Sequence, residues 1–215
     1  MNAPVSLSPI HDALLARNPL RADWSVMPPA VLGFDGDDAQ RAAVVGIADL
    51  SHLPRAGAKG PGAAGWLAAL GLPVPQQPNS WTTLTDGGLI ARLGLTEFLV
   101  DGDASITDTL MQAGRAAGVY PVLRQDASFA LCGARVNELL LQTCNVDFRT
   151  LDAEPSKLIL TSMAGVGVTI LYTRTSTLPC HRLWCDGTYG LYLWDTLVGI
   201  AEELGGGCIG LNALR

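Results

Sequence analysis

The sequence predicts a mixed α+β fold made of two similar halves with mainly antiparallel sheets. The order strand–helix–strands–helix occurs twice along the chain, and a glycine, Gly60 or Gly133, opens the first helix of each half. An apolar pair recurs farther along these helices, as Trp66-Leu67 and Leu139-Leu140. Short strands joined by glycine turns, with helices between the groups, are typical of antiparallel sheets that helices cover, not of a doubly wound parallel sheet.

In the first half, residues 42–122, Gly60-Pro61 places proline in the first turn of a helix that runs to Leu70 and ends at Gly71. Ser105 with Asp108 resembles a capping box and precedes a second helix that Gly118 closes. Short apolar runs, with glycine turns between the last three, predict strands over Val44–Leu50, Trp81–Leu84, Leu89–Leu93 and Glu97–Val100.

In the second half, residues 123–215, Gly133 starts a helix after a strand, and Ala164-Gly165 joins two strands as a hairpin. Gly205-Gly206-Gly207 is interpreted as a flexible stop after the last helix. The expected strands are Ser128–Cys132, Leu158–Met163, Val166–Tyr172 and His181–Cys185, and the last helix is Tyr192–Leu204.

Residues 1–41 are predicted to form an extended arm that contacts a partner. The apolar patch Ile10–Leu20 fits two helical turns, and Trp24 and Pro28-Pro29 follow it. Such an arm needs something to cover its leucine and tryptophan side chains. Packing back onto its own domain, residues 42–215, is the alternative.

The composition restricts the function classes. Charged residues make up 16% and apolar residues 48% of the 215 residues, which indicates either a generous core or a surface that other chains bury. A net charge of −6 without a basic run argues against nucleic acid. The start of the chain lacks the features of a signal peptide, and no apolar run reaches the length of a membrane span. These features predict a soluble cytoplasmic protein.

Motifs for chemistry are largely absent from the sequence. The glycines of 57–65 lack the acidic residue and spacing of a nucleotide loop, and GxSxG is missing. In a strand, Cys180 and His181 point to opposite faces, so this segment supplies too few ligands for zinc, and His181 is interpreted as a surface or interface residue. Five cysteines without paired spacing indicate buried free thiols. We therefore predict no catalytic, cofactor-binding or metal-binding residue in this chain.

Four aromatic residues gather near the C-terminus and have two interpretations. They pack in the core or at its edge, or they anchor an interface, where tryptophan and tyrosine are enriched. The four are Trp184, Tyr189, Tyr192 and Trp194.

Several segments, in order, resemble the folate domain of the glycine-cleavage T-protein-like family. The first half carries Ala48-Asp49-Leu50-Ser51-His52, and the second half opens with Leu131-Cys132-Gly133-Ala134-Arg135. The other matching segments are Gly60-Pro61-Gly62-Ala63, Arg92 to Leu99, Gln125 to Ser128, Leu193 to Leu197, Glu202 to Gly205, and Gly210 to Arg215. In its length and in its lack of a C-terminal barrel, the chain is most similar to the gamma subunits of heterotetrameric sarcosine oxidase and N-methylglutamate dehydrogenase.

Two departures from this family concern folate. After a double glycine and two apolar residues the family has an aspartate, whereas here Gly87-Gly88-Leu89-Ile90 continues into Ala91-Arg92, and Asp86 is not equivalent. Where the family has a pterin-binding glutamate, Arg174-Thr175 continues as Ser176 to Pro179. Without these carboxylates, the donors of a pterin would stay unpaired at a cost of about 1–3 kcal/mol.

The resemblance implies a non-catalytic structural subunit of an oxidoreductase complex. Such complexes oxidise sarcosine or another N-methyl amino acid and pass the one-carbon unit to tetrahydrofolate. FAD, FMN, NAD and tetrahydrofolate are then expected on the partner alpha and beta subunits. A free-standing tetrahydrofolate-dependent transferase or folate-binding protein is the alternative, and a redox or metal-handling module that uses the cysteines is a third possibility.

Overall fold

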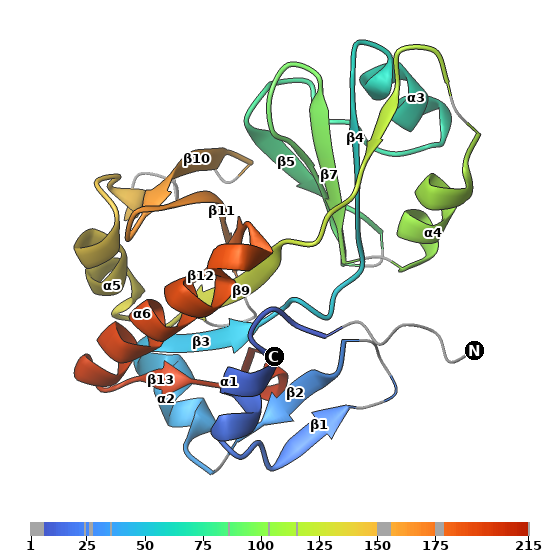
Figure 1. The fold of residues 1–215 in the computed structure, drawn as a ribbon. Coiled ribbons are helices and arrows are strands. Elements are labelled where there is room, and N and C mark those ends of the chain that lie inside the picture. Colours follow the sequence, from blue (N-terminus) through green and yellow to red (C-terminus); the bar gives the residue numbers. More distant parts are fainter. Residues whose placement is uncertain are drawn as a thin grey trace. The chain divides into compact units, whose positions relative to one another are not determined.

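The computed structural model describes residues 7–23, 25, 28–34, 36–85, 87–102, 104–114, 116–149, 156–174 and 179–214 (Figure 1). The chain divides into two compact units. Unit 1 comprises Met1–His52, Asp126–Pro155 and Thr161–Arg215, and unit 2 comprises Leu53–Gln125 and Ser156–Leu160. Helices and mostly antiparallel strands occur in both units, which confirms the predicted α+β fold.

Among the described residues, unit 1 is built on a six-stranded sheet with the order β10-β11-β12-β9-β3-β13. The register is antiparallel between β11, β12, β9 and β3, whereas β13 pairs with β3 in parallel. The strands are β3 (Gly46–Asp49), β9 (Ala127–Cys132), β10 (Leu158–Met163), β11 (Val166–Arg174), β12 (Pro179–Cys185) and β13 (Gly207–Cys208).

Helix α6 (Gly190–Glu203) lies across this sheet (Figure 1). Its apolar side chains recur at helical spacing, so one stripe faces the strands. The fully buried Trp194 packs against Phe129 of β9 with 5.4 Å between the ring centroids. Helix α5 (Val136–Thr143), the 3₁₀ turn η2 (Gly187–Tyr189) and the terminal 3₁₀ turn η3 (Leu211–Leu214) complete this part of unit 1.

The described part of the N-terminal 41 residues packs within unit 1. It forms α1 (His11–Ala16) and a small antiparallel pair, β1 (Arg21–Asp23) with β2 (Ala30–Gly33). The side chains of Ile10, Leu14 and Phe34 are buried. The segment therefore packs these three side chains within its own chain, the alternative to a free arm, whereas Leu7, Leu15 and Leu20 are exposed. Contact with a partner stays a prediction.

The predicted strand Val44–Leu50 is wrong in its first residues. Helix α2 (Asp38–Val45) continues to Val45, and β3 begins at Gly46. The continuous apolar run has no period of two or of 3.6, so the sequence does not mark the boundary.

In its described residues, unit 2 contains a five-stranded sheet with the order β5-β6-β7-β4-β8. The strands are β4 (Arg55–Lys59), β5 (Ser80–Thr83), β6 (Leu89–Arg92), β7 (Glu97–Asp101) and β8 (Tyr120–Val122), and all pairs are antiparallel. Helices α3 (Ala63–Ala69) and α4 (Ala104–Gln112) contact β7, and α4 also contacts β4. Leu67, Ile90, Phe98 and Val100 lie at the centre of its core.

The two halves repeat one topology. The series β4-α3-β5-β6-β7-α4-β8 is followed by β9-α5-β10-β11-β12-α6-β13, and the sheet orders correspond, except that β3 is inserted between β9 and β13. Gly60 and Gly133 hold equivalent places with φ of 114° and 111°. A Cβ atom on either would lie 2.3–2.4 Å from a carbonyl oxygen. Both positions therefore require glycine, as the recurrence in the sequence indicates.

Of the two glycine-containing turns predicted in the second half, one is confirmed and one is wrong. Ala164 and Gly165 both have positive φ, which confirms the tight hairpin between β10 and β11. The interpretation of Gly205-Gly206-Gly207 as a flexible stop is wrong, because Gly207 begins β13 and a Cβ atom on Gly206 would lie 2.0 Å from the carbonyl oxygen of Val45. In the described residues, no helix combines the length and the apolar character needed to cross a bilayer.

Candidate functional site

The first position where the resemblance expects a carboxylate lies inside the sheet of unit 2. Ala91 is fully buried in β6 between Trp81 of β5 and Leu99 of β7. Arg92 follows at the end of the strand, and its guanidinium lies 5.4 Å from the ring centroid of Phe98. In the described strand β6, neither Ala91 nor Arg92 offers a carboxylate that could accept hydrogen bonds from a pterin.

Arg92 instead organises two loops. Its Nη1 donates to the carbonyls of Pro75 and Gln76 at 3.3 and 2.8 Å, Nη2 donates to Leu95 at 2.7 Å, and Nε donates to Gly94 at 3.2 Å. All these acceptors are main-chain oxygens. The side chain at this position therefore stabilises local structure.

One residue and one segment that the resemblance concerns lie outside the described residues. These are Asp86, which precedes the double glycine, and the segment 175–178, which follows β11. The expected loss of the pterin-binding glutamate therefore stays a prediction from the sequence.

The Asp49-Leu50-Ser51-His52 segment follows the end of β3 and is hydrogen-bonded to β9. Asp49 accepts a hydrogen bond from the main-chain N–H of Ser51 at 2.9 Å, and Ser51 Oγ accepts from the N–H of Ser128 at 3.1 Å. Burial raises the pKa of Asp49, and hydrogen bonds from Ser51 and Ser8 oppose this shift. The carboxylate accepts hydrogen bonds that shape the turn after β3.

The cysteines are all free and buried, as predicted. Burial raises the pKa to about 11 for Cys132 and to about 12 for Cys180 and Cys185, and it also raises the pKa of Cys208. The thiolate is the nucleophile and the metal ligand, so these side chains are poorly suited to either task at neutral pH. Within the described part of the chain, no three histidine, cysteine or acidic residues form a metal-binding group.

The prediction that His181 is a surface or interface residue is wrong. Its side chain is buried on β12, with ring centroids of Phe148 and Tyr172 at 5.9 and 5.3 Å in edge-to-face contacts. The strand pattern could not reveal this burial, because both faces of β12 are covered.

The C-terminal aromatic residues divide between the two interpretations. Trp184 and Trp194 are buried in the core of unit 1. Tyr189 and Tyr192 are each 56% exposed, and Tyr192 donates to the carbonyl of Ala164 at 3.2 Å. The two tyrosines are available for an interface, whereas the two tryptophans are not.

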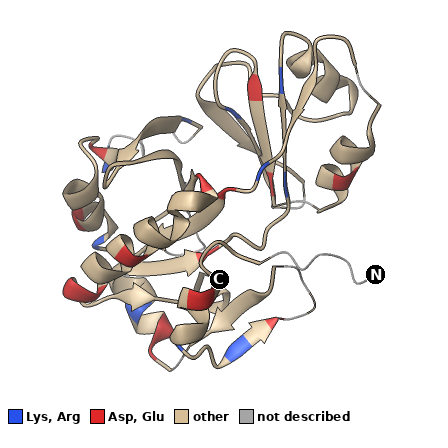
Figure 2. Cartoon of the chain, in the orientation of Figure 1, with Lys and Arg blue, Asp and Glu red and all other residues tan. Residues whose placement is uncertain are grey.

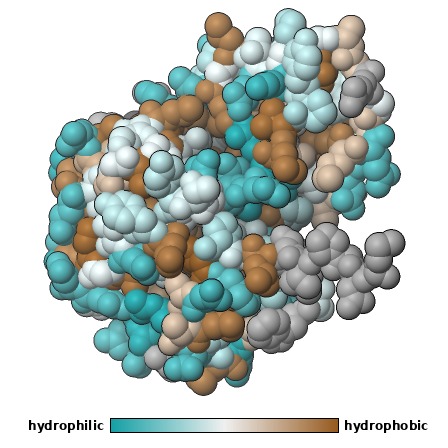
Figure 3. Space-filling model, viewed as in Figure 1, coloured by the Kyte–Doolittle hydropathy of each residue, from teal (hydrophilic) through white to brown (hydrophobic). Residues whose placement is uncertain are grey.

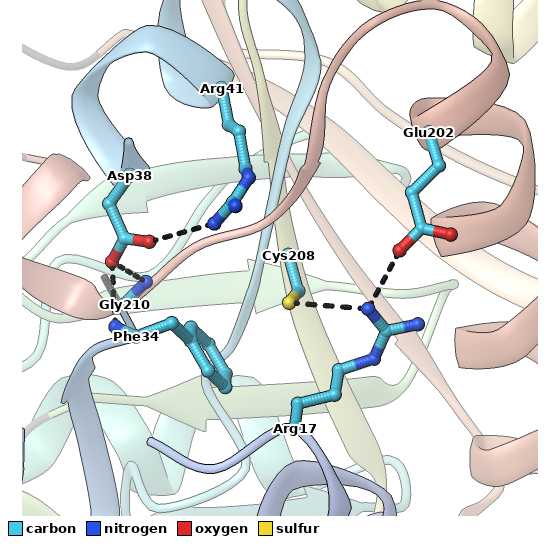
Figure 4. A network of polar contacts seen from close by, with 7 residues as sticks. All are labelled: Arg17, Phe34, Asp38, Arg41, Glu202, Cys208 and Gly210. Carbon is cyan, nitrogen blue, oxygen red and sulfur yellow. Dashed lines mark hydrogen bonds and ion pairs between the residues drawn. The ribbon is translucent and has the colours of Figure 1, made fainter. Parts of the chain in front are cut away.

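A polar network ties both ends of the described chain into unit 1 (Figure 4). The buried Asp38 carboxylate accepts from the main-chain N–H groups of Phe34 and Gly210, both at 3.0 Å, and lies 3.4 Å from Arg41. Arg17 pairs with Glu202 at 2.7 Å and lies 3.6 Å from the sulfur of Cys208. Each buried acceptor is satisfied locally, so the network fixes the N- and C-terminal segments together.

Charged side chains occur on both units without concentrating on one element (Figure 2). The described residues thus provide a stable scaffold, with buried polar groups that serve its turns and ends.

The fold matches two solved structures. Aminomethyltransferase T of the glycine cleavage system from Bartonella henselae aligns with a TM-score of 0.75 and 15% identity over 98% of this chain. A chain of heterotetrameric sarcosine oxidase from Corynebacterium sp. U-96, solved in complex with pyrrole 2-carboxylate, aligns with a TM-score of 0.69 and 17% identity over 95% of this chain.

The extent of the matches differs. This chain spans 61% of the aminomethyltransferase and 98% of the sarcosine oxidase chain. No protein-family model and no curated protein sequence matches it. The chain therefore has the fold that the aminomethyltransferase T protein shares with a chain of heterotetrameric sarcosine oxidase.

Proposed function

We propose that this chain is a non-catalytic structural subunit of a heteromeric, sarcosine-oxidase-like flavoenzyme. The assembly oxidises sarcosine or another N-methyl amino acid and passes the one-carbon unit to tetrahydrofolate. FAD, FMN, NAD and tetrahydrofolate are bound by the companion alpha and beta subunits, and the complex is cytoplasmic. The contribution of this chain is to support its companions by contact.

The observation that carries the proposal is the extent of the two structural matches. The chain aligns along 98% of a chain that works within a heterotetrameric oxidase, but along 61% of the aminomethyltransferase. A role inside an assembly therefore fits the alignment better than a role as a free-standing transferase.

The replacement of a carboxylate in β6 supports the non-catalytic part of the proposal. Ala91 is enclosed by neighbouring strands, and Arg92 is held by four main-chain carbonyls. Neither side chain can accept hydrogen bonds from the donor edge of a pterin.

Exposed apolar side chains support the structural part. Four apolar side chains are each more than 70% exposed, namely Leu20, Leu95, Met111 and Leu123. Figure 3 shows hydrophobic residues interspersed among hydrophilic ones on one face of the molecule. Single exposed leucines are normal on monomers. Together with a charged fraction of 16%, however, they fit a surface that companions bury.

Co-expression tests the proposal. The full chain is produced alone and together with the alpha and beta chains of a sarcosine-oxidase-like complex from the same host, and the soluble fraction is measured. We expect aggregation of the isolated chain and soluble co-purification with the companions, with a flavin absorbance in the shared peak. A stable, monodisperse chain that ignores these companions contradicts the proposal.

Single substitutions then locate the docking surface. Leu95→Ser, Leu123→Ser and Tyr189→Ser each remove an exposed apolar group without touching the core. A substitution inside the interface is expected to reduce co-purification at least tenfold, whereas the others serve as matched controls that leave it unchanged.

Calorimetric titration with tetrahydrofolate distinguishes the structural subunit from the alternative, a free-standing folate-dependent protein. Micromolar binding by the full chain without companions favours a folate-dependent transferase or folate-binding protein. Absence of binding by the chain, with binding by the assembled complex, favours the structural subunit.

A further inference from the structure

Unit 2 contains a cavity of about 440 Å³ between helix α4 and strands β4 and β8, which we call the α4 cavity. Among the described residues that line it, Arg55 and Arg124 are charged and the others are apolar or glycine. The lining is Arg55, Ala56, Gly57, Trp66, Leu110, Met111, Ala113, Gly114, Ala116, Val119, Pro121, Val122, Leu123 and Arg124.

The fold itself does not require this cavity. Helix α6 is the counterpart of α4 in the repeated topology, and it fills the space above its sheet with Trp194 and Leu197, both fully buried. Helix α4 buries Thr107 instead, and Ala113 and Ala116 follow it where larger side chains could stand. The cavity is therefore a local feature of unit 2 that small side chains maintain.

Both arginines line the cavity, close to the point where β4 and β8 stop pairing. The last pair is Gly57 with Val122, and Arg55 and Arg124 each lie two residues beyond it along their chain segments. Residues two apart share a face of a strand, so Arg55 is on the face that Gly57 would occupy with a side chain. A Cβ atom on Gly57 would lie 2.8 Å from Arg124 Nε, which places that guanidinium on the same face.

Each arginine has a carboxylate nearby, and Arg124 keeps one donor that no described residue accepts from. Arg55 lies 3.9 Å from the fully buried Asp101, and its own side chain is 5% exposed. Arg124 Nη2 donates to Glu97 at 2.5 Å, whereas its buried Nε has no hydrogen-bond partner among the described residues. Two like charges that line one cavity repel each other, and a buried donor without an acceptor adds to that cost.

We propose that the α4 cavity binds a small monocarboxylate with an aliphatic or single-ring aromatic body. The carboxylate accepts from Arg124 Nε and lies between the two guanidinium groups, which favours an anion over a neutral or cationic head group. The apolar body lies beneath α4 against Leu110 and Trp66. The proposal does not rest on the proposed function, because the contacts that carry it, at Arg124, Leu110 and Trp66, lie within unit 2, although Met111 and Leu123 of the lining are among the exposed residues named above.

Isothermal titration with octanoate tests this site on the full chain, in the assembly in which it is purified. Octanol and octylammonium carry the same tail with a neutral and a cationic head, and acetate carries the head alone. We expect saturable binding of octanoate, at least tenfold weaker binding of octanol, and no binding of octylammonium or acetate. Quenching of tryptophan fluorescence is expected to accompany binding and to be lost in Trp66→Phe.

Variants separate the head and body contacts. Arg124→Gln is expected to weaken octanoate about tenfold and to leave octanol unchanged, and Arg124→Lys is expected to restore part of the difference. Ala113→Leu fills the cavity and should abolish binding of both while the melting temperature is kept. Arg149→Gln removes an exposed arginine of unit 1 as the control and should change nothing.

Two results overturn the proposal. One is the absence of saturable octanoate binding by a chain whose melting temperature shows that it is folded. The other is equal affinity for octanoate and octanol, since the arginines would then not select the head group.

Discussion

At the scale of single residues, the side chains that resemble functional groups serve the scaffold. Arg92 occupies a place where the family resemblance expects an acid, and it holds two loops through main-chain carbonyls. Asp49 belongs to a segment that resembles the folate-domain family, and it holds the turn between β3 and the chain that follows. Both roles lead to effects on stability that can be measured.

Replacing Arg92 should destabilise unit 2. Arg92→Met keeps the apolar stem over Phe98 but removes the donors to four carbonyls, and we expect a loss of about 1–3 kcal/mol in the free energy of unfolding. Chemical denaturation measures this loss. The control Arg149→Met removes an arginine that is exposed and paired with Asp147, and should stay within about 0.5 kcal/mol of the original chain. Equal effects of both variants would contradict the role given to Arg92.

Asp49 should make folding stability depend on pH. Burial raises its pKa above the ordinary value of 3.8, so the folded chain binds the proton more tightly than the unfolded chain. Stability relative to Asp49→Asn should therefore fall as the pH rises from about 3.8 through the folded pKa, and it should level off above it. Thermal unfolding between pH 3 and 8 measures the difference.

Asp186 provides a control of opposite sign. Hydrogen bonds from Thr188 lower the pKa of this exposed carboxyl. Stability relative to Asp186→Asn should therefore be present above pH 3.8 and be lost as the pH falls through the folded pKa. If stability changes with pH in the same direction in both comparisons, burial is not the main influence on the pKa of Asp49.

At the scale of elements, close backbone contacts define the two repeated halves. Gly60 and Gly133 open their helices with the same positive φ and the same approach to a carbonyl oxygen. Gly206 lets the chain after α6 pass beside Val45, so that β13 can pair in parallel with β3. The sheet of unit 1 therefore depends on a glycine that lies outside any regular element.

A pair of glycine substitutions tests this dependence. Gly206→Ala places a Cβ atom 2.0 Å from the carbonyl oxygen of Val45, and should cost about 2 kcal/mol or more of stability. Gly199→Ala lies within α6 with no atom within 4 Å of the new Cβ, and should stabilise the chain by about 0.5–1 kcal/mol. Denaturant titration compares the two, and a mild effect at Gly206 would contradict the close contact.

Much of this architecture could be predicted from the sequence, because periodic apolar patterns and glycine turns are local signals. The hairpin at Ala164-Gly165 and helix α6 carry both kinds of signal and were predictable. Strand β4, with the sequence Arg-Ala-Gly-Ala-Lys, has neither β-branched nor aromatic residues, and it forms because β7 and β8 pair with it. Its role could not be read from local propensity.

The candidate sites also differ in how far the sequence alone predicts them. The lack of a carboxylate at Ala91-Arg92, where the resemblance expects one, is visible in the sequence, whereas the burial of His181 depends on elements distant along the chain. The α4 cavity depends on the pairing of β4 with β8, which places Arg55 and Arg124 in the lining of one cavity although they are distant in the sequence. Contacts of this kind require the tertiary structure.

At the scale of the whole molecule, each unit is a packed scaffold, and the proposed task of the chain is contact with companions. The fold is shared with an aminomethyltransferase and with an oxidase subunit, so fold alone does not choose between catalysis and support. Folded free-standing subunits and obligate ones differ in whether the isolated chain persists in solution.

The native mass of the particle tests the central claim most directly. The tagged full chain is purified from its own host under native conditions, and the mass is measured by light scattering while flavin absorbance is recorded. The account predicts a particle several times heavier than the 22.6 kDa of this chain, with flavin absorbance in the same peak. A 22.6 kDa monomer that transfers one-carbon units to tetrahydrofolate without companions would contradict it.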